Sequence, residues 1–275
     1  MTSWRAIRVA VMGLAVMAAV CVLSGVPAWT ADDLPKGDAI LDKFVEVTGG
    51  KAAYDKVTSS IEKAKVEIVG QGMTLTSTSY NVAGKNYTKI ESDAVGTIEQ
   101  GINADFVWEK TTMSGPEIKE GAEAAFMRRS AALDGIANWR KYQTKAETVG
   151  LETIDSKPAY KVTVTAKDGA IETRYYDKES GLLVKEEMTL ELKIGKIPIV
   201  GTMTDYKKEG DLLVPHKLTQ VMAGTQQMAI TIESVEYNKE IPAETFKTPA
   251  DVQALYDKKQ KEKTDADKPK DKPAA

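Results

Sequence analysis

The strongest constraint on the fold is an alternating pattern in residues 172–194, ETRYYDKESGLLVKEEMTLELKI. The apolar positions after the turn signal at 178–181 are Leu182, Val184, Met188, Leu190, Leu192 and Ile194, and only Glu186 interrupts them. A period of two places successive side chains on opposite faces of a sheet, so the pattern predicts a strand with one buried and one solvated face. The same turn signal recurs at residues 206–214, which indicates a meander of such strands.

Further strands are predicted on both sides of this stretch. Runs rich in Val, Ile, Thr and Tyr are separated by turn segments at residues 70–72, 83–85, 103–105 and 155–157. Residues 111–121 read as a loop. The pattern predicts about eleven to twelve strands in all, and hence a mainly β protein of the α+β class.

Three helices are predicted among the strands. Residues 38–50 carry apolar side chains at helical spacing and end at Gly49 and Gly50, and a short helix follows at 51–57. Residues 122–141, AEAAFMRRSAALDGIANWRK, lack strand alternation and are rich in helix formers. Because strands come before and after it, this third helix must cross a face or an end of the sheet.

The first residues have the pattern of an export signal. Arg5 and Arg8 precede an apolar run that ends in small residues, which predicts a signal peptide of residues 1–28 with cleavage after Ala28. The alternatives are cleavage after Ala31, an uncleaved membrane anchor formed by residues 9–28, and a lipid-modified Cys21. Cleavage would remove the one cysteine of the sequence, and with it any disulfide, thiol nucleophile or thiolate ligand.

The other end of the chain is predicted to be a charged tail. A short helical piece is expected at residues 251–256, and residues 257–275 are mostly Lys, Asp, Pro and Ala, so we expect them to be disordered. A tether to acidic lipid or cell wall is the alternative for this tail. The formal net charge of the 275 residues is −3, which gives no reason to expect a nucleic-acid partner.

The sequence shows no constellation typical of catalysis. His216 is the one histidine, and we interpret it as an ordinary surface residue of a strand. Glu186 and Glu187 are adjacent in a strand and therefore face opposite sides, where they do not share a proton. We predict no catalytic residues, no metal site and no cofactor.

Apolar surface is the remaining candidate for a binding site. If the sheet is curved, its dry face would form an apolar ligand-binding cavity, and methionine suits surfaces that accept irregular chains. The predicted cavity residues are Met73, Leu75, Met188, Leu190, Leu192, Val200, Met203, Met222 and Met228 of the strands, with Phe126, Met127 and Trp139 of the inserted helix. Ordinary core packing is the alternative interpretation, and for each of these residues taken singly it is the favoured one.

Five segments carry a resemblance to a known family. They are ILDKFVEVTGGKAAYDKV, GINADFVWE, TRYYDKESGLLVKEE, TDYKKEGDLLVPHKLTQ and ITIESVEYNKEIPAETFKTP. Together they resemble the outer-membrane lipoprotein-sorting, or LolA-like, proteins of the bacterial envelope. The resemblance implies a curved antiparallel half-barrel of about 11 strands over residues 32–250, with helices covering the concave face. It also implies a periplasmic carrier that shelters lipid acyl chains. This chain departs from the lipoprotein carriers in its greater length and its charged tail.

Three functional hypotheses follow. The first is a periplasmic carrier or chaperone, expected to be a monomer, whose inserted helix moves aside to admit the acyl chains of a lipid or lipoprotein. The second is a sensor or interaction module on the same fold, with an envelope membrane protein as its partner. The third is an enzyme that acts within the cavity, against which the lack of a nucleophile, metal site or histidine cluster argues.

Overall fold

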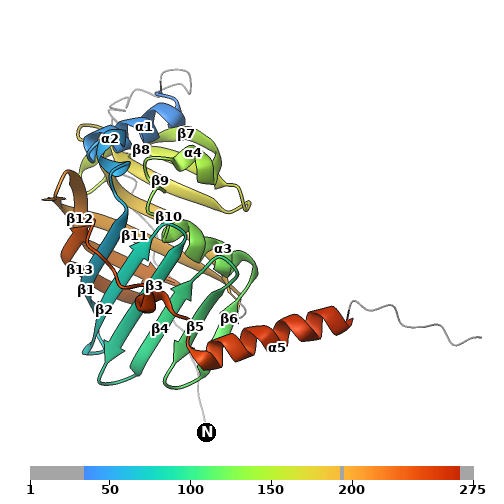
Figure 1. Ribbon diagram of the computed structural model, residues 1–275. Coiled ribbons are helices and arrows are strands. Elements are labelled where there is room, and N and C mark those ends of the chain that lie inside the picture. Colours follow the sequence, from blue (N-terminus) through green and yellow to red (C-terminus); the bar gives the residue numbers. More distant parts are fainter. Residues whose placement is uncertain (1–33, 193–194, 267–275) are drawn as a thin grey trace, which may run out of the picture.

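The computed structural model describes residues 34–192 and 195–266, so the predicted signal peptide lies outside the described residues. Its strands form one antiparallel sheet (Figure 1). They are β1 Ser59–Ile68, β2 Met73–Val82, β3 Lys85–Ser92, β4 Gly96–Ile102, β5 Val107–Thr111, β6 Gly115–Lys119, β7 Gln143–Ile154, β8 Lys157–Ala166, β9 Ile171–Asp177, β10 Leu183–Leu192, β11 Gly195–Glu209, β12 Leu212–Met222 and β13 Gln226–Tyr237.

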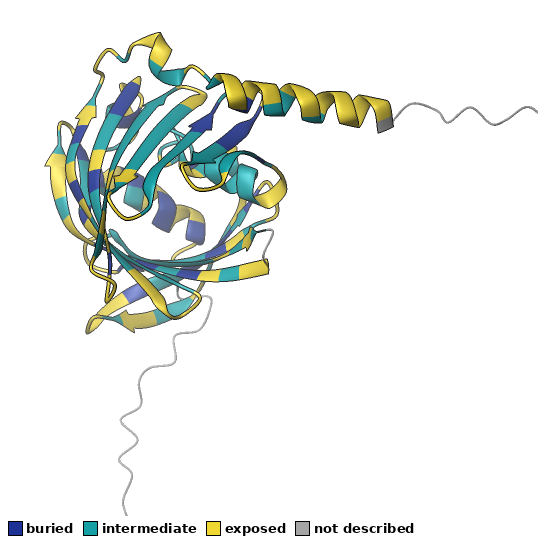
Figure 2. Ribbon diagram, turned by 90° about the horizontal axis from the view of Figure 1, so that it is seen from below, coloured by how far each residue is buried: buried dark blue, intermediate teal, exposed yellow. Residues whose placement is uncertain are grey.

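The sheet consists of two meanders joined at one seam. Its strand order is β6-β5-β4-β3-β2-β1-β13-β12-β11-β10-β9-β8-β7, so β1 pairs with β13 in the middle and β6 and β7 are the two edges. The described sheet does not close on itself, and it curves strongly around its concave side (Figure 2). The predicted fold class, a curved antiparallel half-barrel with helices, is confirmed, with 13 strands in place of about 11.

Strand β6 lies in the segment that we predicted to be a loop. It pairs with β5 through Val107 opposite Lys119 and Lys110 opposite Pro116. Proline lacks the amide proton of a ladder hydrogen bond and is tolerated where one side of a strand has no partner. Gly115 and Pro116 are turn signals in the sequence, which is why this segment was predicted to be a loop. Both residues are nevertheless compatible with an edge strand.

The helices occupy the concave side and one outer edge. They are α1 Gly37–Val47, α2 Lys51–Tyr54, α3 Gly121–Ser130, α4 Trp139–Tyr142, the 3-10 helix η2 Ala243–Phe246, and α5 Ala250–Ala266. The largest core cluster lies beneath α1 and consists of Ile40, Leu41, Val45, Tyr54, Trp139, Val162, Val164, Tyr176 and Leu212. This core closes one end of the half-barrel, and α3 lies over the rest of the concave face. Within the described residues, no helix is both long and apolar enough to cross a membrane.

The C-terminal helix packs on the convex side of the sheet. Val252 is fully buried against Phe106, Trp108 and Ile118, and the ring of Tyr256 stacks on Phe106 with centroids 4.1 Å apart. Our prediction of disorder from residue 257 is wrong for residues 257–266, which continue α5. They are held in part by Lys259 and Lys263, whose amino groups contact Glu120 at 3.4 Å and 2.8 Å. Residues 267–275 lie outside the described chain.

The segment between the two edge strands crosses the concave side of the sheet, as expected. It is not one helix over residues 122–141, however, because α3 ends at Ser130 and turns occupy residues 131–138 before α4 begins. Asp134 fastens these turns by hydrogen bonds from Tyr142 and, at 2.9 Å, from Nζ of Lys141. After the break, Ala131, Ala132, Leu133 and Ile136 line a cavity between this segment and the sheet.

Candidate functional site

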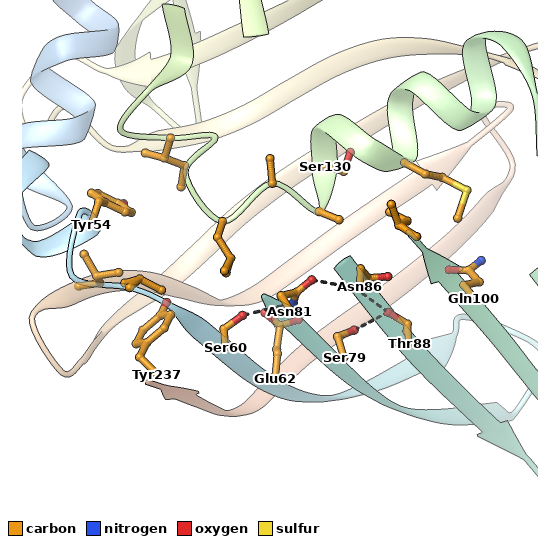
Figure 3. A pocket seen from close by; sticks show the side chains of 18 of the residues that line it. Tyr54, Ser60, Glu62, Ser79, Asn81, Asn86, Thr88, Gln100, Ser130 and Tyr237 are labelled. Atoms are coloured by element: carbon orange, nitrogen blue, oxygen red, sulfur yellow. Dashed lines mark hydrogen bonds between the residues drawn. The ribbon is translucent and has the colours of Figure 1, made fainter. Parts of the chain in front are cut away.

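The largest cavity lies between strands β1–β4 and the segment that follows α3. It has a volume of about 420 Å³. The helical side is apolar and includes Phe126, Met127, Ala131, Ala132, Leu133 and Ile136. The sheet side is different, because it consists mainly of Ser60, Glu62, Ser79, Asn81, Asn86, Thr88 and Gln100, which we call the polar wall. Figure 3 shows these side chains on one side of the pocket and Ser130 of α3 on the other.

Hydrogen bonds connect most of the polar wall across the strands. Asn81 Nδ2 donates to Ser60 Oγ at 3.2 Å, and Asn86 Nδ2 donates to Asn81 Oδ1 at 2.7 Å. The hydroxyl oxygens of Ser79 and Thr88 are 3.0 Å apart (Figure 3). The register explains these contacts, since residues directly opposite each other in neighbouring strands share a face. The wall is therefore a preformed array of neutral polar groups.

Glu62 is the exception in this array. Among the cavity-lining residues that the structure describes, it is the only one with a charged side chain. Burial raises the pKa of its carboxyl group above the usual value, and the charge of nearby His216 opposes this only in part. Glu62 thus brings into the cavity a carboxyl group that is protonated more readily than one in water.

The concave face becomes apolar toward the other end of the strands. Rows of paired residues cross the sheet there, for example Leu75–Val66–Ile230–Leu218–Met203 and Met73–Ile68–Met228–Gln220–Gly201. Met222 and Met188 both pair with Ile199, and Leu190 and Leu192 follow Met188 on the same face of β10. We call these apolar residues and Ala64 of β1 the apolar strip. Several of them, including Met73, Leu75, Met188 and Leu190, remain half-buried.

Helix α3 spans this interior and is held at both ends by buried charges. Near its start, Lys119 Nζ lies 2.9 Å from Glu123 of α3 and also 3.1 Å from Glu109. Near its end, Arg129 Nη2 donates to Glu172 Oε1 at 2.9 Å and also binds Asp168. No residue of α3 itself is buried. Polar fastenings, rather than a packed apolar face, therefore keep α3 in place.

Glu172 is the central residue of the contacts that hold the C-terminal end of α3. Its other oxygen accepts a 2.6 Å hydrogen bond from Arg174 Nη2. Burial alone would raise the pKa of Glu172, but the guanidinium groups of Arg174 and Arg129 hold it below its usual value. Glu186 also lies near Arg174, and burial raises the pKa of Glu186 despite the attraction of Arg174. Arg129 also lines two smaller cavities of about 190 and 220 Å³.

Most of the predicted cavity residues lie on the concave side. Those on strands are Met73, Leu75, Met188, Leu190, Leu192, Met203, Met222 and Met228, which all belong to the apolar strip. Phe126 and Met127 line the largest cavity from the helical side. Trp139 is instead part of the core beneath α1, where its Nε1 donates to Asp42 at 3.0 Å, although it also borders the 220 Å³ cavity.

Two sequence-based interpretations are corrected. Val200 pairs with Glu187 and lies between Ile199 and Gly201 in a regular strand, so its side chain is on the convex face. His216 is buried rather than exposed, with Nδ1 2.9 Å from the carbonyl oxygen of Ile232 and Nε2 2.9 Å from Glu209. Neither residue is available to a ligand in the cavity. Among the described residues, no group of three or more His, Cys, Asp or Glu side chains could hold a metal ion.

Comparison with solved structures identifies the fold. A LolA superfamily protein from Nitrosomonas europaea matches with a TM-score of 0.52 and 10% sequence identity, over 78% of this chain and 99% of the other. This chain has a LolA-like fold. A DUF1329 family protein from Desulfovibrio piger matches with a TM-score of 0.54 and 15% identity, over 79% of this chain and 100% of the other. No protein-family model and no curated protein sequence matches the chain.

Proposed function

We propose that this LolA-like protein is a periplasmic carrier that shelters the acyl chains of a lipid or lipoprotein inside its half-barrel. The observation that carries the proposal is the apolar strip, which draws residues from six strands and faces a helix, α3, that has no buried residue. Half-buried methionine and leucine side chains in a concave surface gain by contact with an apolar ligand. The flexible methionines suit a ligand of irregular shape.

The fastening of α3 gives the cavity a means of opening. A helix without buried residues loses little apolar contact when it moves away from the sheet. Its release requires the contacts of Arg129 with Glu172 and Asp168 to break, and also the 2.6 Å hydrogen bond from Arg128 Nη1 to the carbonyl oxygen of Asn103, while the Lys119–Glu123 contact holds the other end. We therefore propose α3 and the turns after it as a lid that pivots near residue 121.

The interior chemistry supports binding rather than catalysis. The polar wall consists of amides and hydroxyls whose hydrogen bonds are largely made within the wall. His216 Nδ1 is hydrogen-bonded to the carbonyl of Ile232 and its Nε2 lies 2.9 Å from Glu209, so neither nitrogen is placed to activate the hydroxyls of the wall. We propose that the protein acts as a monomer and without a cofactor. An envelope membrane protein is the proposed partner for delivery of the cargo.

Native mass spectrometry tests this proposal. Protein purified without detergent from the envelope of its own host is expected to carry a mass excess that matches acylated lipid. Leu75→Trp fills the concave face and should abolish the excess. Thr76→Trp is the matched control, because Thr76 is exposed on the convex face of the same strand and its replacement should leave the excess unchanged. A wild-type protein that shows no mass excess and does not bind added lipid would contradict the carrier function.

A further inference from the structure

The concave face of β1 and β2 changes from polar to apolar along the strands. On β1 the inward residues are, in order, Ser60, Glu62, Ala64, Val66 and Ile68. On β2 the residues opposite them are Asn81, Ser79, Ser77, Leu75 and Met73. The apolar part of β1 spans roughly 13 Å, from four residue steps of about 3.3 Å. A molecule that lies along these strands meets a polar end and an apolar end.

This gradient matches an amphiphile in one orientation. An acyl chain against the polar wall would bury the donors and acceptors that the amides and hydroxyls do not use among themselves, which is unfavourable. The chain therefore belongs on the apolar strip, and the headgroup belongs at the polar wall, beneath Ser130 and the turns after α3 (Figure 3).

The composition of the polar wall selects among headgroups. Serine and threonine hydroxyls and the amides of Asn and Gln can donate and accept, so they complement a group that does both. Ser60 accepts from Asn81 and keeps its own proton for a ligand. An anionic headgroup would only accept hydrogen bonds, and it would meet Glu62 in a cavity whose described lining holds no Lys or Arg.

On the basis of the proposed carrier function, we propose that the polar wall recognises an uncharged, hydroxyl-rich headgroup, such as a sugar, and discriminates against anionic headgroups. Glu62 contributes a hydrogen-bonding group in either protonation state, because a carboxylate accepts from hydroxyls and a carboxylic acid also donates. The raised pKa of Glu62 agrees with a site that is built for neutral ligands.

Calorimetric titration with three ligands of equal chain length tests this inference. The probes are decyl maltoside, decanoate and decyltrimethylammonium, each below its critical micelle concentration at pH 8. We expect decyl maltoside to bind at least about tenfold more tightly than decanoate, because decanoate must bury an unpaired carboxylate. Glu62→Gln should increase the affinity for decanoate and so reduce the difference in affinity between decyl maltoside and decanoate. Glu91→Gln on the convex face of β3 is the matched control.

A second variant tests the hydroxyl groups directly. Ser79→Ala with Thr88→Val removes both partners of one hydrogen bond. Asn86 Nδ2, which also donates to Thr88 Oγ1 at 3.4 Å, keeps its 2.7 Å hydrogen bond to Asn81 Oδ1. This variant should lose roughly tenfold in affinity for decyl maltoside, as expected for two hydrogen bonds to the ligand, with decanoate binding unchanged. Thr76→Val is its control on the convex face.

The outcomes separate the two proposals. If none of the three ligands binds, both the carrier function and the headgroup selectivity are overturned. If all three bind equally and the Ser79/Thr88 variant has no effect, the carrier function stands and the selectivity is overturned. If decyltrimethylammonium binds most tightly and loses that advantage in Glu62→Gln, the site recognises a cation, and our assignment of a neutral headgroup is wrong.

Discussion

The fastening of α3 predicts a measurable opening equilibrium. Arg129→Gln removes a 2.9 Å hydrogen bond to Glu172 and the contact with Asp168, while Glu172 keeps its 2.6 Å bond to Arg174. Hydrogen bonds to charged groups contribute about 1.5–3 kcal/mol when partly buried, and the Arg129 side chain is 13% exposed. We therefore expect the lid to lose about 2 kcal/mol, which raises its open population about 30-fold.

Hydrogen exchange measured by mass spectrometry reports this population. Amides of residues 121–130 should exchange about 30-fold faster in Arg129→Gln than in the wild type, and amides of β12 and β13 should not change. Because an open lid admits ligand, association with a lipid probe should also become faster.

Arg140→Gln is the matched control for this experiment. Arg140 pairs with Asp42 at 2.7 Å, but both side chains are about half exposed, at 55% and 52%. Such surface pairs contribute at most about 1 kcal/mol, and this one joins α4 to α1 rather than α3 to the sheet. The reasoning is refuted if Arg129→Gln speeds exchange of α3 less than about threefold, or if Arg140→Gln has the same effect on α3.

Three further predictions concern stability. Since the folded-state pKa of Glu172 is lowered, its contribution to stability is complete above its unfolded pKa of about 4.5 and is lost as the pH falls through the lowered folded-state pKa. The protection of the α3 amides, measured as exchange relative to the intrinsic rate at each pH, should therefore fall in acid. Gly101→Ala places a Cβ 2.3 Å from the Trp108 ring and should cost about 1–3 kcal/mol in urea unfolding, whereas Gly150→Ala, with open space around it, should cost less than 1 kcal/mol. Val252→Ala should cost about 2 kcal/mol locally and make α5 cleavable by protease at lower protease concentrations, with the sheet left intact.

Strand periodicity was sufficient to predict a sheet of half-buried strands and which residues of several strands share a face, whereas its curvature was implied only by the resemblance to LolA-like proteins. Met188, Leu190 and Leu192 were placed correctly because alternation holds through β10. The placement of Val200 in the cavity was wrong, and the sequence alone could have shown this. Val200 and Met203 were both predicted to face the cavity, but residues 200 and 203 of a regular strand lie on opposite faces. Glu186 was visible as an interruption of the apolar pattern, and it lies near the half-buried Arg174.

The polar wall and the fastening of α3 were not predictable by the same reasoning. In β2, Ser and Thr occupy both faces, and in β3 both faces are largely polar, so periodicity does not show which face points inward. Their placement depends on the register with β1, where Ser60 and Glu62 lie opposite Asn81 and Ser79. The contact between Arg129 and Glu172 joins residues 43 positions apart, and nothing in the local sequence of either one indicates its partner.

The seam between β1 and β13 has a consequence for the order of assembly. Each of the two meanders forms through pairings between neighbouring strands, but Ser60 pairs with Tyr237, near the opposite end of the chain. During synthesis from the N-terminus, β1 has its backbone groups unpaired on one side until β13 is complete. An unpaired strand of this length can form hydrogen bonds with strands of other chains and so promote aggregation. The nascent protein is therefore most vulnerable to aggregation in the interval before its thirteenth strand emerges, and a helper that covers β1 during that interval would raise the yield of folded protein.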